Sequence, residues 1–177
     1  MALMNLFKQI KNLSASRGYW LLYIAGSLSL LAAALFFQFV HDEQPCLMCI
    51  QVRLLISLLI FVSIAGLLFR HNRVMSIITH LSAVLVFAGL SERSYMLLGT
   101  ERGFVFADCG FSLGLPSWFA IEEWLPWLYR VETSCGYTPE VIFGITMAEA
   151  LMVLSVLFLL FSLSVFIASL ARLRSAE

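Results

Sequence analysis

The sequence predicts an all-α membrane protein, a bundle of four transmembrane helices in one domain that covers residues 1–177. Of its 177 residues, 61% are hydrophobic and 12% are charged, whereas soluble proteins have about 25% charged residues. The mean hydropathy is +0.93. Four segments are apolar enough and long enough to cross a bilayer. The formal net charge is zero, so nothing in the sequence indicates a nucleic-acid partner.

The first two predicted spans cover residues 19–40 and 50–69. The first has no charged residue, and a helix of its length would extend about 33 Å, against about 30 Å for a bilayer core. A cleaved signal peptide is the alternative. However, this apolar run exceeds the roughly 7–15 residues of such peptides and lacks a small-x-small cleavage site. The second span is interrupted at its start by Gln51 and Arg53.

The third and fourth predicted spans cover residues 74–98 and 141–170. The third contains His80, which we interpret as structural because it lies nearer the other end of the span, away from the cysteines. The fourth contains one acid, Glu149, about two turns from its start. Because a charge is costly inside a bilayer, such an acid suggests a function. We favour a protonated acid bonded to a neighbouring helix over a proton donor to a reduced cofactor.

The basic residues predict the orientation of the chain. Seven of the eleven lie before the first span, between the second and third spans, or after the last span: Lys8, Lys11, Arg17, Arg70, Arg73, Arg172 and Arg174. By the positive-inside rule, these segments and both termini are cytoplasmic. The connections at residues 41–49 and 99–140, which are mostly acidic, then face outward.

All four cysteines lie in the two outer connections. Cys46 and Cys49 form a C-x-x-C pair at the start of the second span, and Cys109 and Cys135 lie in the longer loop. An even number of non-cytoplasmic cysteines indicates disulfide chemistry. A C-x-x-C pair can form a disulfide across one helical turn. Spacing alone leaves a redox pair, a static disulfide and a metal pair open, and Cys109 and Cys135 could be a structural staple.

Cys49 and Arg53 share one face of the second span. Cys49 lies near the helix N-terminus, where unpaired N–H groups and the helix dipole favour a thiolate. Arg53 follows four residues later, about one turn deeper, where its charge would favour a thiolate or an anionic reduced cofactor. The alternative is an arginine that snorkels toward the membrane surface.

The loop at residues 99–140 is too long for a simple connector. Its aromatic residues are typical of a short interfacial helix on the bilayer surface, with Glu122 and Glu123 toward water. These aromatic residues are Trp118, Trp124, Trp127 and Tyr129.

Several motifs resemble those of the bacterial disulfide bond formation protein B (DsbB) family. They are Pro-Cys-Leu-Met-Cys-Ile-Gln-Val-Arg at residues 45–53, Phe-Phe-Gln at 36–38, Ala-Asp-Cys at 107–109 and Leu-Pro-Ser-Trp at 115–118. The resemblance covers nearly the whole chain. It departs at Val52, where the family commonly has an acid, and at residues 147–150, where Met-Ala-Glu-Ala replaces a frequent Met-Pro-x-Trp.

The resemblance implies an inner-membrane thiol:quinone oxidoreductase. Cys46, Cys49, Cys109 and Cys135 would be catalytic, and Arg53 with Cys49 would bind a non-covalent quinone, ubiquinone or menaquinone. The partner would be a periplasmic DsbA-like thioredoxin-fold protein that is reoxidised at the Cys109/Cys135 disulfide, with electrons passing through a transient Cys46–Cys135 link. No metal is implied.

Three alternatives remain open. The chain could be a non-enzymatic membrane protein with structural disulfides, or a soft-metal carrier that uses Cys46 and Cys49. It could also be an enzyme of the vitamin K epoxide reductase type, although in that type the active pair lies near the end of a later span.

Overall fold

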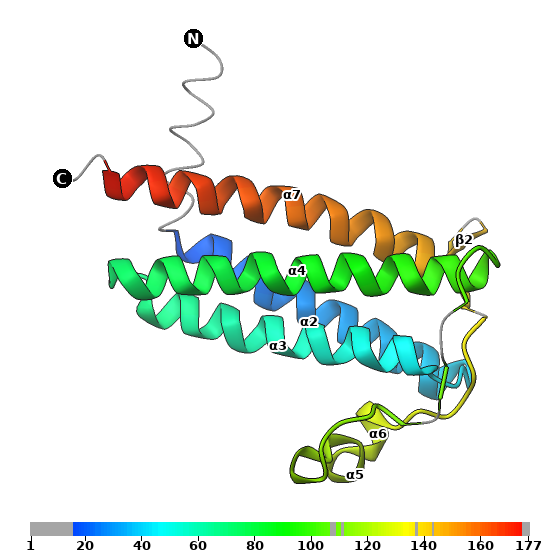
Figure 1. Ribbon diagram of the computed structural model, residues 1–177. Coiled ribbons are helices and arrows are strands. Elements are labelled where there is room, and N and C mark those ends of the chain that lie inside the picture. The colour runs from blue at the N-terminus through cyan, green and yellow to red at the C-terminus, as the bar shows by residue number, and fades with distance from the viewer. Residues whose placement is uncertain (1–15, 107–108, 111, 137, 143, 175–177) are drawn as a thin grey trace.

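Four long apolar helices dominate the computed structural model, which describes residues 16–106, 109–110, 112–136, 138–142 and 144–174 (Figure 1). They are α2 (Arg17–Val40), α3 (Leu47–Phe69), α4 (Arg73–Glu101) and α7 (Met147–Arg174). Each is long and apolar enough to cross a membrane, so the predicted all-α, four-helix membrane fold is confirmed. Lys8, Lys11, Ala107 and Asp108 lie outside the described residues.

The helices pack in a defined order. Helix α3 packs against α2 and α4, and α4 packs against α7. The start of α2, the turn between α3 and α4, and the end of α7 lie at one end of the bundle (Figure 1). The α2–α3 connection and the long loop lie at the opposite end, so the segments that carry the cysteines share one end.

Polar side chains define where the helices begin. Ser16 accepts a hydrogen bond from the Gly18 N–H at 3.1 Å, and Asn72 accepts one from the Val74 N–H at 3.1 Å. Such caps satisfy backbone donors that have no partner inside the helix. Cys46 does the same for α3, which therefore starts at Leu47, earlier than the predicted residue 50.

Helix α7 begins at Met147, later than the predicted residue 141. Residues in the first part of the predicted span instead form a small antiparallel hairpin, β1 (Glu140–Ile142) and β2 (Ile145–Thr146). The turn between the two strands gives residue 144 a φ of +77°, a backbone conformation that favours glycine. Thr146 and Glu149 then form a reciprocal capping box, since the Glu149 N–H donates to Thr146 Oγ1 and the Thr146 N–H donates to the Glu149 carboxylate.

Glu149 therefore occupies the first turn of α7, which corrects the prediction that it lies about two turns inside the span. Its carboxylate also pairs with Arg102 at the end of α4. Its role is to cap α7 and tie it to α4 at the membrane surface, so no charge needs to be buried in the bilayer core.

The bundle core contains a close helix–helix approach at Gly66. Trp20 is fully buried, and a Cβ atom added at Gly66 would lie 2.4 Å from its ring. His80 is also fully buried, with its ring 4.8 Å from that of Trp20 between centroids. A side chain larger than hydrogen at residue 66 would therefore force α3 away from α2.

The long loop contains short helical turns rather than one continuous helix: a 3₁₀ turn (Ser117–Phe119), α5 (Ile121–Trp124) and α6 (Pro126–Tyr129). Pro126 begins α6, and it cannot donate the backbone hydrogen bond that would continue α5. Trp118, Trp124 and Trp127 are more than half exposed, as expected of side chains that meet a membrane interface.

One of the two acids predicted to face water has a structural partner in this loop. The Glu122 carboxylate accepts hydrogen bonds from the Leu113 N–H at 3.2 Å and the Ser112 hydroxyl at 3.5 Å. It thereby connects α5 to the segment that follows Cys109.

Candidate functional site

The C-x-x-C pair caps α3. The Cys49 N–H donates to Cys46 Sγ at 3.3 Å, so the sulfur of Cys46 takes the place that serine or aspartate usually occupies at a helix N-terminus. Both are free thiols; Cys46 is buried and Cys49 is partly exposed. We expected the helix N-terminus to act on Cys49, but the capping sulfur is that of Cys46.

Hydrogen bonds lower the pKa of the Cys46 thiol from 9.0 to about 7. The largest contribution is the hydrogen bond from the Cys49 thiol, and backbone N–H groups at the start of α3 add to it, against the opposing effect of burial. Because a thiol of lower pKa leaves faster in thiol–disulfide exchange, Cys46 is suited to be released from a mixed disulfide near neutral pH.

Cys109 and Cys135 form a disulfide, with their Cα atoms 5.7 Å apart. Both sulfurs pack against the buried cluster that contains Cys46, Met48, Leu97 and Ala148. The structure thus brings all four cysteines, which the sequence places in two separate loops, to one site.

Backbone contacts hold the Cys135 segment against the C-x-x-C motif. The Pro45 carbonyl accepts hydrogen bonds from the Glu132 N–H at 3.0 Å and the Thr133 N–H at 3.3 Å. Cys46 and Thr133 pair as an isolated parallel β-bridge. Cys135 follows Thr133 by two residues, so this bridge holds the loop disulfide beside Cys46.

Arg53 is buried, with 6% of its surface exposed, and does not snorkel to water. Its Nη1 donates to Gln38 Oε1 at 2.6 Å and to the Leu128 carbonyl at 3.3 Å. Its Nη2 donates to the Ala34 carbonyl at 3.2 Å. The guanidinium therefore joins α2, α3 and α6, and all three of these acceptors are neutral.

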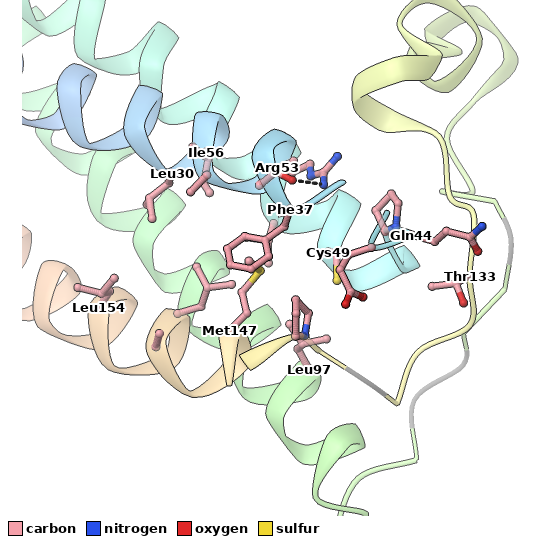
Figure 2. A pocket seen from close by; sticks show the side chains of 18 of the residues that line it. Leu30, Phe37, Gln44, Cys49, Arg53, Ile56, Leu97, Thr133, Met147 and Leu154 are labelled. Atoms are coloured by element: carbon pink, nitrogen blue, oxygen red, sulfur yellow. Dashed lines mark hydrogen bonds between the residues drawn. The ribbon is translucent and has the colours of Figure 1, made fainter. Parts of the chain in front are cut away.

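An apolar cavity of about 250 Å³ adjoins Cys49 and Arg53. Side chains from α2, α3, α4 and α7 converge on it, and Thr133 of the long loop lies at the end nearest Cys49 (Figure 2). Its apolar wall is made by Leu30, Ala33, Phe37, Val52, Ile56, Leu97, Met147, Ala150, Leu151 and Leu154. Besides the Arg53 cation and the Cys49 thiol, the acidic residue Glu43 lines the cavity. A mostly apolar cavity with a cation beside a thiol suits a flat, apolar molecule that gains negative charge on reduction.

Sequence reasoning did not connect three residues to Arg53, and it placed one of them, Tyr129, among the interfacial aromatic residues, whereas Tyr129 is 4% exposed. Gln38, Ser57 and Tyr129 either bond to Arg53 or bond to one another beside it. For Gln38 a signal was present, because a lone amide at the end of an otherwise apolar span calls for a polar partner inside the bundle. Nothing in the sequence connects Tyr129 to Ser57, which is 72 residues away.

The outer ends of α4 and α7 are joined by a second polar group. The Glu101 carboxylate accepts hydrogen bonds from Thr138 at 2.6 Å and from Thr146 at 3.2 Å. These bonds hold the segment that contains Pro139 and Met147, both of which line the cavity. The cavity wall is thus fixed to α4 by Glu101.

Comparisons with known proteins identify the family of this chain. The family model described as "Disulfide bond formation protein DsbB" matches residues 16–165. Disulfide bond formation protein B of Psychromonas ingrahamii is 31% identical over 165 residues, which cover 88% of this chain and 86% of that protein.

Two further relatives carry the same description. Disulfide bond formation protein B of Shewanella sp. strain MR-4 is 31% identical, over 78% of this chain and 79% of its own length. Disulfide bond formation protein B 2 of Pseudomonas aeruginosa strain PAO1 is 29% identical, over 75% and 80%. With four membrane-spanning helices and its cysteine pairs at one end of the bundle, this chain belongs to the DsbB family of disulfide bond formation proteins.

Proposed function

We propose that this protein is a membrane thiol:quinone oxidoreductase that reoxidises a periplasmic, DsbA-like thioredoxin-fold protein. One observation carries the proposal. Cys49 lines the apolar cavity beside Arg53, while Cys46, its partner in the C-x-x-C pair, belongs to the buried cluster against which Cys109 and Cys135 pack. The C-x-x-C pair thus stands between a disulfide and a site suited to a small electron acceptor.

The proposed orientation follows from the charges. Both termini lie in the cytoplasm and the cysteines lie on the periplasmic side of the bacterial inner membrane, by the positive-inside rule. All four sulfurs are then on the side where disulfides persist. A soluble dithiol partner could reach the Cys109–Cys135 loop without entering the bilayer.

The first step is disulfide exchange with the partner. A thiolate of the reduced partner attacks Cys109, the Cys109–Cys135 bond breaks, and a mixed disulfide forms. The second partner thiol then displaces Cys109. The partner leaves with a disulfide, and Cys109 and Cys135 hold two electrons and two protons as thiols.

The second step moves these electrons to the C-x-x-C pair. When Cys46 and Cys49 are joined, the Cys135 thiolate attacks Cys46 and releases Cys49 as a thiolate. Cys109 then attacks Cys135 in the Cys46–Cys135 link, which restores the loop disulfide and frees Cys46. The bridge between residues 45–46 and 132–133 keeps these sulfurs within reach.

The third step regenerates the Cys46–Cys49 disulfide at the cavity. A quinone bound there supplies a two-electron, two-proton acceptor. Cys49 presents its sulfur to the cavity, and Arg53 holds a positive charge where negative charge develops. The apolar walls exclude water and orient the ring. Cys46 closes the disulfide with Cys49.

The proposal predicts that Cys49→Ser abolishes quinone-dependent oxidation of a reduced thioredoxin-fold partner, because no sulfur then faces the cavity. Stopped-flow fluorescence of the partner, with the protein in nanodiscs and a short-chain ubiquinone analogue, measures this rate. Ser63→Ala, on the same helix but away from the cavity, is the control and retains the wild-type rate. Full-rate turnover by Cys49→Ser would show that the electron path is wrong.

A further inference from the structure

The long loop has a second anchor on α3, formed by Tyr129 at the end of α6. Tyr129 is 4% exposed, and its hydroxyl donates to Ser57 Oγ at 2.6 Å. Ser57 in turn donates to the Arg53 carbonyl at 2.9 Å. In these two hydrogen bonds the Ser57 hydroxyl accepts one proton and donates its own, so Tyr129 and the Arg53 carbonyl are both bound by the same hydroxyl.

The residue before Tyr129 bonds directly to the Arg53 side chain. The Leu128 carbonyl is one of three acceptors that hold the guanidinium, beside Gln38 and Ala34 of α2. Helix α6 therefore contacts Arg53 twice, once at its backbone through Ser57 and once at its guanidinium. When α6 docks on α3, it fixes the position of the cation that lines the cavity.

Apolar contacts also hold α6 against α3. Tyr129 packs in a buried cluster with Leu47, Ile50 and Val131. The two hydrogen bonds to the Arg53 region add direction to this packing, because a hydrogen bond requires a defined donor–acceptor geometry. A residue that only anchors the loop does not need this defined geometry, whereas a residue that positions Arg53 does need it.

We propose that Tyr129 and Ser57 are positioning residues for Arg53, and that docking of α6 on α3 and binding of a quinone in the cavity stabilise each other. This inference rests on the proposed function. Coupling between two equilibria is reciprocal: if docked α6 improves quinone binding, bound quinone must strengthen α6 docking by the same factor. The loop that carries the disulfide thereby senses whether an electron acceptor is present.

Two pairs of variants separate positioning from stability. Tyr129→Phe removes the hydroxyl and keeps the ring, and Tyr95→Phe makes the same change at a site on α4 that is 47% exposed. Ser57→Ala removes the shared hydroxyl, whereas Ser57→Thr keeps it. Ser91→Ala is a matched control, since Ser91 bonds to the carbonyl of Phe87 in α4 at 2.9 Å, as Ser57 does to Arg53.

The test is hydrogen–deuterium exchange of the full chain in nanodiscs, with the loop disulfide intact, with and without a short-chain ubiquinone analogue. In the wild type the analogue slows exchange at residues 128–131 about three- to tenfold, the effect of one neutral hydrogen bond. In Tyr129→Phe and Ser57→Ala this slowing falls below about twofold. Tryptophan quenching then gives a Kd that is about three- to tenfold higher.

The controls and Ser57→Thr behave as the wild type. Equal slowing in Tyr129→Phe, or wild-type protein that binds and reduces the analogue with no change in exchange, would overturn the inference alone. If Tyr129→Phe does not fold, the Ser57→Ala and Ser57→Thr pair decides the question. Wild-type protein that neither binds nor reduces the analogue would overturn the proposed function, and this inference with it.

Discussion

At the scale of single residues, the chemistry depends on which sulfur occupies the N-terminus of α3. Cys46 caps the helix and receives a hydrogen bond from the Cys49 thiol. These hydrogen bonds stabilise the Cys46 thiolate. Cys46 also lies on the side of the C-x-x-C pair that faces the loop disulfide. Cys49 lines the cavity instead, so in the proposed function Cys46 exchanges electrons with the loop disulfide and Cys49 with the quinone.

The lowered pKa of Cys46 gives a direct prediction. In reduced C-x-x-C protein that retains the loop disulfide, the first thiol titrates near the Cys46 pKa of about 7. In Cys49→Ala this midpoint moves up, because the largest stabilising hydrogen bond is lost. Thiolate ultraviolet absorbance against pH measures both midpoints. A midpoint that does not move would contradict the assignment.

Removal of the Arg53 charge should weaken quinone binding more than it affects the loop disulfide. Hydrogen bonds to a charged group contribute about 1.5–3 kcal/mol, so Arg53→Met should raise the Kd of a quinone analogue about ten- to one-hundredfold. The rate at which a small dithiol reduces Cys109–Cys135 should stay within about twofold of wild type. Arg130→Met, at an exposed site in the loop, is the control.

If the disulfide-reduction rate changed by as large a factor as the quinone Kd, Arg53→Met would have disrupted the whole end of the bundle. The sequence alone predicted that Arg53 lies on the Cys49 face. It could not predict Gln38, Leu128 and Ala34 as the groups that hold it, because those contacts depend on how α2 and α6 pack against α3.

At the scale of elements, the spans were predictable and their outer ends were not. Apolar length fixes where a helix crosses the membrane. The start of α7 instead depends on the Thr146 and Glu149 capping box and on the Gly144 turn. Residues in the first part of the predicted span are apolar enough to continue a helix, so hydropathy placed its start too early.

The α2–α3 contact gives a stability prediction at this scale. Gly66→Ala places a Cβ within 2.4 Å of the Trp20 ring, and overpacking of this kind costs about 1–3 kcal/mol. Gly26→Ala meets nothing within 4 Å, so it should be neutral or stabilising by up to about 1 kcal/mol. Unfolding in mixed micelles measures both free energies. Equal effects would show that Trp20 does not pack on Gly66.

At the scale of the whole molecule, the fold brings two cysteine pairs that are distant in the sequence together at one site. The positive-inside pattern predicted that the four cysteines share one side of the membrane. It could not predict that residues 132–133 pair with residues 45–46 and bring Cys135 to Cys46, because backbone pairing between loops leaves no periodic signal. The outline of the cavity, which α2, α3, α4 and α7 line, could not be predicted from the sequence either, although Cys49 and Arg53 were expected to bind a quinone.

The most direct test of the proposed electron path is a count of thiols at each cysteine after quinone is added. Protein with all four cysteines reduced is mixed anaerobically with a short-chain ubiquinone analogue, quenched at intervals, alkylated and analysed by peptide mass spectrometry. The account predicts that thiols are lost in pairs, with one quinol formed for every two thiols, and that Cys109 and Cys135 lose theirs only in protein whose Cys49 is intact. Loss of the Cys109 and Cys135 thiols to quinone in Cys49→Ser protein, or no quinone-dependent loss of thiols in the wild type, would contradict it.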